Sequence, residues 1–170
     1  MERIITIALD CGMTLVVEPI ANVASVAIAW LLPAGSACDP ADGEVYSTVL
    51  SELVMRGAGP LDARAHSDAL DRLGVQRACD VQTHHLRIDA TMLGSRLLDA
   101  LPLIADMVCS PRLPADALEA VRSLCVQTLD GLDDDPQSLV MLRLRERHIA
   151  PPFNRHGYGT RSVLESASIE

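Results

Sequence analysis

The chain has 170 residues, enough to bury one hydrophobic core, and its formal net charge is −9. This acidic balance argues against nucleic-acid binding, which requires clustered Lys and Arg to neutralise phosphates. Aromatic residues make up only 2% of the chain, so the core must be built from aliphatic side chains. The five cysteines include no Cys-x-x-Cys pair, which argues against structural zinc and a disulfide framework and favours reduced thiols.

The first residues contain no basic segment followed by an apolar run. We therefore see no signal peptide and favour the cytoplasm over the periplasm. The longest apolar run, Val26–Pro33, is too short to span a bilayer.

The first third of the chain predicts three strands. Arg3–Ala8 and Thr14–Glu18 are strand-like runs separated by an Asp-Cys-Gly turn, which predicts a hairpin. Val23–Leu32 is apolar at both alternating sets of positions, as in a strand that is covered on both faces.

The stretch Ser47–Gly57, STVLSELVMRG, predicts an amphipathic helix. Asp42 is its predicted N-cap, and Gly57 is the predicted first residue beyond its C-terminus. The predicted buried stripe consists of Tyr46, Val49, Leu50 and Leu53. The second face carries Thr48, Ser51, Glu52 and Met55.

The remainder predicts one further helix, two strands and then more helices. Asp62 caps a helix that runs to Leu73 and is stopped by Gly74. The following elements are strands Val75–Val81 and Thr83–Met92, then helices Ser95–Cys109, Ala115–Leu129 and Pro136–His148, and a final helical segment within residues 162–170. Within the second strand, Leu86, Ile88, Ala90 and Met92 face the core, whereas His85, Arg87, Asp89 and Thr91 face outward. This order predicts an α+β domain with helices stacked on one face of a mostly antiparallel sheet.

The histidines do not show the spacing of metal ligands. His84 and His85 are adjacent on a predicted strand and so point to opposite faces. We expect His66 on an exposed helix face, His148 in the last turn of a helix and His156 in a loop.

Several collinear stretches resemble a known family. They are ALDCGMTLVVEPI, SVAIAWLLPAGSACDP, VLSELVMRG, ALDRLG, LLDALPLIADMVCSPRLP, DDDP and HGYGT. In this order and spacing the chain resembles the N-terminal part of the insulinase, mitochondrial processing peptidase and pitrilysin family of zinc metallopeptidases, especially its small bacterial members. The resemblance implies a half-clamshell α+β domain.

The family's site is an inverted zinc motif, His-x-x-Glu-His, on the first long helix. Two imidazoles at i and i+4 share one helix face and hold Zn²⁺, the intervening Glu is the general base, and a Glu from a later helix is the third ligand. Aligned on MRG and on DDDP, this chain has Thr48, Ser51, Glu52 and Thr128 at the four positions. Hydroxyls are poor ligands for Zn²⁺, and Ser51 cannot replace a carboxylate base. No His-x-x-Glu-His or His-Glu-x-x-His occurs elsewhere.

The resemblance therefore implies a non-catalytic homologue with no catalytic residues and no metal of its own. It would serve as the partner subunit or chamber wall of a zinc-bearing homologous peptidase, and zinc would be present only in that partner. His85, Arg87 and Asp89 are the candidate residues facing a peptide or the partner. The alternatives are an active zinc peptidase with displaced ligands and a purely structural subunit like the respiratory-complex core proteins of the family.

The resemblance also carries an expectation about domain organisation. We expect residues 1–170 to be a single N-terminal peptidase-like domain that is incomplete at its C-terminal end. An open sheet edge and uncovered apolar surface would then favour self-association.

Overall fold

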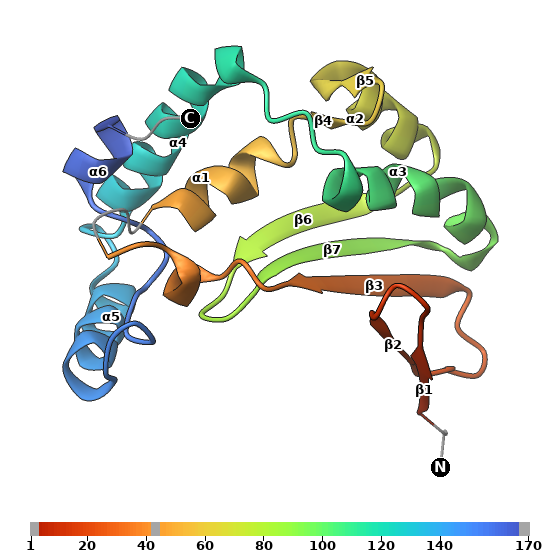
Figure 1. Cartoon of the computed structure of the whole chain (residues 1–170), viewed down its shortest axis with the longest axis horizontal. Coiled ribbons are helices and arrows are strands. Elements are labelled where there is room, and N and C mark those ends of the chain that lie inside the picture. Colours follow the sequence, from red (N-terminus) through yellow and green to blue (C-terminus); the bar gives the residue numbers. More distant parts are fainter. Residues whose placement is uncertain (1–3, 42–44, 167–170) are drawn as a thin grey trace.

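The computed structural model describes residues 4–41 and 45–166. Helices lie over one face of a small antiparallel sheet, as Figure 1 shows. The strands are β1 (Ile5–Ala8), β2 (Thr14–Val17), β3 (Ser25–Leu32), β4 (Gly57–Ala58), β5 (Leu61–Asp62), β6 (Gln76–Val81) and β7 (Leu86–Leu93). The α-helices are α1 (Tyr46–Leu53), α2 (Ala63–Arg72), α3 (Leu97–Cys109), α4 (Leu118–Gly131), α5 (Pro136–His148) and α6 (Arg161–Ser166). The predicted α+β class is confirmed.

The main sheet has the strand order β3–β7–β6, with β7 in the centre and antiparallel to both neighbours. The predicted inward set of β7 is confirmed, because Leu86, Ile88, Ala90 and Met92 are each at most 3% exposed. Their partners across the ladder include Trp30 of β3 and Cys79 of β6, both of which pair with Ile88. These residues form the helix-facing side of the sheet.

The described residues form three core clusters, and one of them joins the end of α1 to β4, β7 and α3 through Val54, Ala58, Ile88 and Met107. Over the sheet, α2 and α3 contribute Leu70, Ala100 and Ile104, which pack on β7. Away from the sheet, α1 packs on α4 and α6 through Val49, Val121 and Leu164. The first long helix therefore links the sheet layer to an outer layer formed by α4 and α6.

The face of the sheet opposite the helices is not covered by any described residue. Alternate residues of β3 are exposed on it, including Ala27, Ala29 and Leu31. The prediction that Val23–Leu32 is covered on both faces is therefore wrong for the described part of the chain. Its unbroken apolar pattern reflects small alanines on an open face as well as large residues on the packed face.

The hairpin of β1 and β2 forms a separate two-stranded sheet, as predicted. Its register places Ile5 opposite Val17 and Ile7 opposite Leu15, so these four apolar side chains share one face. All four are between 37% and 44% exposed. Figure 1 shows the hairpin on the side of β3 that is remote from the helices.

Helix α1 differs in detail from its prediction. It ends at Leu53, and Gly57 lies beyond it in β4 with a φ of 104°. Tyr46 is 44% exposed, whereas Ser47 and Ser51 are buried. Val49 and Leu53 are buried as predicted, so the buried side of α1 differs from the prediction at Tyr46, Ser47 and Ser51.

The N-terminus of α1 is capped by a residue that the sequence analysis did not select. Predicted cap Asp42 lies outside the described residues. Asp39 instead accepts hydrogen bonds from the backbone N–H and the Oγ hydroxyl of Ser47, both at 2.9 Å. A carboxylate is favourable at this end of a helix, where backbone N–H groups lack partners. The predicted cap of α2 by Asp62 is confirmed, and Asp135, which the sequence analysis did not name, caps α5.

Two histidine predictions are wrong. His66 is 1% exposed, and its Nε2 lies 3.0 Å from the carbonyl oxygen of Leu103 in α3. Because α2 packs on α3 at this position, His66 is buried although most of α2 is polar. His84 and His85 lie in the connection between β6 and β7 and not on a strand.

Helix α3 also buries a different set of residues from the predicted stripe. Leu98 is 82% exposed and Leu101 is 39% exposed, while Ala100 and Met107 are buried. In a helix that is apolar on most sides, the periodicity does not say which side meets the sheet. No helix in the described ranges is both long enough and apolar enough to cross a membrane.

Candidate functional site on the first helix

Helix α1 positions Glu52 between the sheet and the outer helices. Glu52 is half-buried, and it is close enough to Cys79 of β6 and Cys125 of α4 for its charge to affect both thiols. Burial, followed by the charges of Asp80, Glu52 and Asp89, raises the pKa of the Cys79 thiol to about 12. Burial and then the charge of Glu52 raise the pKa of the Cys125 thiol to about 11. Both groups are therefore neutral thiols at physiological pH and are not activated nucleophiles.

The three hydroxyls at the motif positions all donate to backbone carbonyls. Ser51 Oγ donates to the carbonyl of Thr48 at 2.7 Å, within α1. Thr128 Oγ1 donates to the carbonyl of Leu124 at 3.0 Å, within α4, and Thr128 is exposed. Thr48 Oγ1 donates outside its own helix, to the carbonyl of Gly157. The hydrogen-bonding capacity of these side chains is thus directed at the backbone.

These residues do not fit the zinc ion that the family's motif would hold. Thr48 and Glu52 share one face of α1, where the family would place two imidazoles, but only Glu52 is a good ligand type. Ser51 has no basic group with which to activate a water molecule. Among the described residues, no three His, Cys, Asp or Glu side chains are grouped closely enough to hold a metal ion. We therefore derive no hydrolytic step from this helix.

The segment 153–159, which we call the strap, connects α5 to α6 and folds back onto the start of α1. Ser36 Oγ donates to the carbonyl of Arg155 at 3.2 Å, and the Arg155 guanidinium donates to the carbonyl of Asp39. Arg145 of α5 holds the beginning of the strap by donating to the carbonyl of Phe153 at 3.0 Å. With the bond from Thr48, these contacts fix the strap against α1 and the turn that precedes it.

The residues predicted to face a peptide or partner lie on and next to the uncovered face of the sheet. Arg87 Nε and Asp89 Oδ1 of β7 are 2.8 Å apart and form an ion pair on that face. His85 lies just before β7, with its ring 6.2 Å from that of His84. The structure therefore brings Arg87 and Asp89 together and leaves His85 at the end of the strand.

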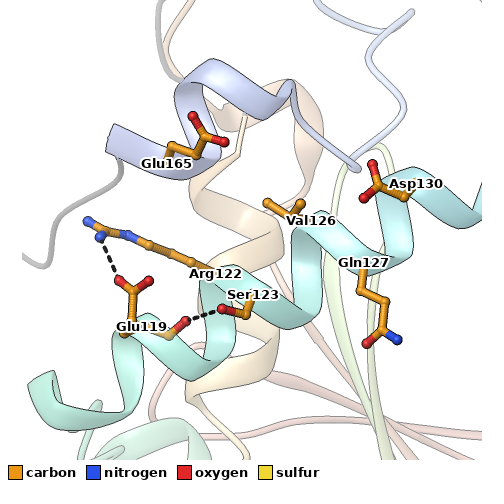
Figure 2. A pocket seen from close by; sticks show the side chains of 7 residues that line it. All are labelled: Glu119, Arg122, Ser123, Val126, Gln127, Asp130 and Glu165. Carbon is orange, nitrogen blue, oxygen red and sulfur yellow. Dashed lines mark hydrogen bonds and ion pairs between the residues drawn. The ribbon is translucent and has the colours of Figure 1, made fainter.

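A pocket that the sequence analysis missed lies between α4 and α6, away from the motif positions. Its volume is about 490 Å³, and Figure 2 shows its lining by Glu119, Arg122, Ser123, Val126, Gln127, Asp130 and Glu165. All except Glu165 come from one stripe of α4. The spacing of these α4 residues is visible in the sequence, but a polar helix stripe by itself indicates only a solvent-facing surface.

Comparison with known proteins agrees with this architecture. No family model matches the chain. Proteins named zinc protease from Mycobacterium tuberculosis and Mycobacterium bovis are 28% identical to it over 156 residues, which cover 92% of this chain and 34% of theirs. The chain thus spans about a third of the length of these curated relatives.

Solved structures share the fold at low sequence identity. A peptidase M16 inactive domain from Pseudomonas fluorescens superposes with a TM-score of 0.86 at 17% identity, covering 98% of this chain and 41% of that one. Pitrilysin superposes with a TM-score of 0.79 at 19% identity, covering 96% of this chain and 18% of its own. The chain thus has the fold of M16 peptidase domains and is similar in sequence to proteins named zinc protease. A protease from Helicobacter pylori has the same fold, with a TM-score of 0.87, 16% identity and coverage of 99% of this chain and 41% of its own.

Proposed function

We propose that this chain is a non-catalytic M16 domain that acts as the partner or chamber wall of a zinc-bearing homologous peptidase. The observation that carries the proposal is that the four motif positions hold three hydroxyls and one carboxylate in place of the zinc ligands and the general base. Thr48, Ser51 and Thr128 use their hydroxyls to bond backbone carbonyls, and Glu52 is a single carboxylate near two neutral thiols. A domain that keeps the helix geometry without the ligands acts through its surfaces.

The surfaces that remain uncovered support a role in assembly. The apolar hairpin face of Ile5, Ile7, Leu15 and Val17 is exposed, and in the described part of the chain no strand pairs with the edge of β3 that lies opposite β7. An exposed apolar patch beside an unpaired strand edge favours contact with another polypeptide.

The Arg87–Asp89 pair lies on the open face of the same sheet. We propose that it provides polar contacts to the partner, with His85 contributing at the end of the strand. Peptide bound in the shared chamber would add as a strand to a sheet edge, the recognition mode that such a sheet permits.

The test is a peptidase assay on this chain alone, on a zinc-bearing homologue from the same genome purified by itself, and on a mixture of the two. Fluorogenic peptides serve as substrates, and every arm is repeated with a chelator. We expect no chelator-sensitive hydrolysis by this chain alone. We expect a changed rate or cleavage pattern when it is added to the homologue.

Two results would contradict the proposal in different ways. Chelator-sensitive hydrolysis by the chain alone, abolished by Glu52→Ala, would mean that displaced ligands form an active site. A homologue that is fully active alone, with rate and cleavage pattern unchanged by this chain, would exclude the partner role. If the two proteins nevertheless associated, a purely structural role would replace it.

A further inference from the structure

We infer that the hydrogen bond from the Thr48 hydroxyl holds the strap in place. The position of the family's first metal ligand would then serve, in this chain, to fix the segment 153–159 over the face of α1 that carries Thr48 and Glu52. This inference concerns the conformation of one chain and goes beyond the proposed partnership. It rests on the difference between Thr48 and the other hydroxyls at motif positions. Ser51 and Thr128 bond carbonyls three and four residues earlier in their own helices, whereas the bond from Thr48 joins residues 109 positions apart in the chain.

The strap fits closely against the elements that it crosses. A Cβ atom on Gly157 would lie 3.1 Å from Cγ1 of Val81 and 3.7 Å from Cβ of Ser36. Gly157 has a φ of 78°, a conformation that glycine adopts readily and other residues avoid. The strap backbone therefore comes within contact distance of β6, the turn before α1, and α1 itself.

The strap has other contacts besides the bond from Thr48, including that of His156 Nε2, which lies 3.9 Å from Oε1 of Glu146 in α5. Arg155 is tied to Ser36 and Asp39, and the rings of Phe153 and His84 are 5.2 Å apart. The contacts of Arg155 and Phe153 hold the first half of the strap to the loops around the sheet. Thr48 is the residue of α1 that the described hydrogen bonds connect to the strap, and it does so at Gly157, just before the strap turns into α6.

This arrangement excludes a metal ligand at position 48 for a steric reason. The carbonyl of Gly157 occupies the space directly beyond the Thr48 hydroxyl. An imidazole at this position would extend further than a hydroxyl and would displace the strap. The same residue position can thus face a metal or hold the strap, and this chain has the residue that holds the strap.

The test is hydrogen–deuterium exchange of the 170-residue chain, followed in a peptide that covers the strap. The substitution Thr48→Val keeps the side-chain shape and removes the hydroxyl. A net hydrogen bond of about 1 kcal/mol corresponds to a change of roughly five-fold in an opening equilibrium. We therefore expect exchange of strap amides, including those of Arg155 and Tyr158, to be about five-fold faster, while peptides from β7 exchange as in the wild type.

Three controls distinguish the loss of the Thr48 hydrogen bond from a general loss of stability. Thr48→Ser retains the hydroxyl and should restore slow exchange. Thr128→Val and Ser51→Ala remove hydroxyls that bond within one helix and should leave strap exchange unchanged. Wild-type exchange in Thr48→Val would overturn the inference, as would equally fast strap exchange in Ser51→Ala. If Thr48→Val proves too unstable to study, fast strap exchange in Thr48→Ser would also overturn it.

Discussion

The region around the start of α1 and the β1–β2 hairpin lie at two ends of the molecule and differ in how well their side chains are satisfied by the rest of the chain. Around the start of α1, polar side chains find partners: Asp39 caps the helix, Ser51 and Thr48 bond carbonyls, and Arg155 joins the strap to the preceding turn. At the other end, the β1–β2 hairpin exposes apolar side chains, and one edge of β3 pairs with no strand among residues 4–41 and 45–166.

This difference indicates which part of the domain is suited to bind another molecule. A helix whose hydroxyls already bond carbonyls has little capacity left for a metal ion or a substrate. Exposed apolar surface is unfavourable in water, and its burial against another chain contributes about 25 cal/mol per Å². We call the region around the start of α1 the closed end, because its hydroxyls already have hydrogen-bond partners. We call the β1–β2 hairpin the open end, because its apolar side chains are exposed and could contact another chain.

The largest effect that we predict is the loss of close packing at the closed end on Gly35→Ala. A Cβ atom at Gly35 would overlap the backbone of Gln82, His84 and His85 in the β6–β7 connection. Backbone cannot move aside as a side-chain tip does, so we expect destabilisation on the order of 3 kcal/mol. Urea unfolding followed by circular dichroism measures it.

Gly131→Ala is the matched control for Gly35→Ala. A Cβ atom at Gly131 meets nothing within 4 Å, and Gly131 is the last residue of α4. Because Ala is the better helix former, this change should be neutral or stabilising by up to about 1 kcal/mol. Equal midpoints for the two variants would mean that the α1 end is not tightly packed around Gly35.

The second prediction concerns association through the open end. The substitutions Ile7→Lys and Leu15→Lys together place two charges on the apolar face of the hairpin, where the two residues are directly paired. We expect the wild-type chain to sediment as larger species with rising concentration and the double variant to remain smaller. Lysine on an exposed strand is a known way in which proteins prevent such contacts.

Thr6→Lys with Thr14→Lys supplies the same charge on the opposite face of the hairpin. Thr6 pairs with Val16 and Thr14 with Ala8, so neither belongs to the apolar face. This control should associate as the wild type does. A wild-type chain that stays monomeric at the highest concentration tested would contradict the contrast between the two ends.

The sequence pattern predicted the elements better than their faces. The cap Asp62, the bounds of α5 and the inward set of β7 depend on local or strictly alternating signals, and each of these predictions was confirmed. The orientation of α1 and α3 depends on which neighbour covers a helix that is apolar on several sides. That choice is made by tertiary packing between distant segments and is not encoded in helical periodicity.

For the candidate site, the alignment selected Thr48, Ser51, Glu52 and Thr128 but did not indicate their hydrogen-bond partners. The bond from Thr48 to Gly157 joins segments that meet only because the strap returns to α1. His66 was misassigned for the same reason, since its burial depends on α3, which begins more than two elements later. Neither contact has a signal in the local sequence.

A smaller effect is predicted for the thiols near Glu52. Cys11, Cys38 and Cys109 are exposed, whereas Cys125 is buried and Cys79 is partly buried. We expect iodoacetamide at pH 8 to modify these three exposed cysteines in the native protein. Because their pKa values are raised, Cys79 and Cys125 should react only after unfolding. Peptide mass spectrometry identifies the modified residues.

The same pKa shifts predict weaker folding at alkaline pH. From about pH 9, the unfolded chain loses thiol protons that the folded chain retains up to the raised pKa values of about 11 and 12. The unfolded state then binds fewer protons, so stability falls as the pH rises through this window. The decline should be smaller in Cys79→Ala/Cys125→Ala. An equal decline in that variant would mean that other groups cause it.

The smallest expected effect is that of zinc on the closed end. The possible donors at α1 are one carboxylate, two hydroxyls and two protonated thiols, and one of the hydroxyls holds the strap. Binding of a zinc ion would therefore have to break a hydrogen bond or remove protons from thiols of raised pKa. We expect protein purified without added zinc to contain far less than one equivalent by elemental analysis. We also expect added zinc to leave the thermal unfolding midpoint within error of that of chelator-treated protein, because only an ion that binds the folded state raises it. The informative variant is Glu52→Ala, which removes the one good ligand at the motif positions. Stoichiometric zinc that disappears in Glu52→Ala would show that the α1 end is a working metal site and would reverse the contrast with the hairpin end.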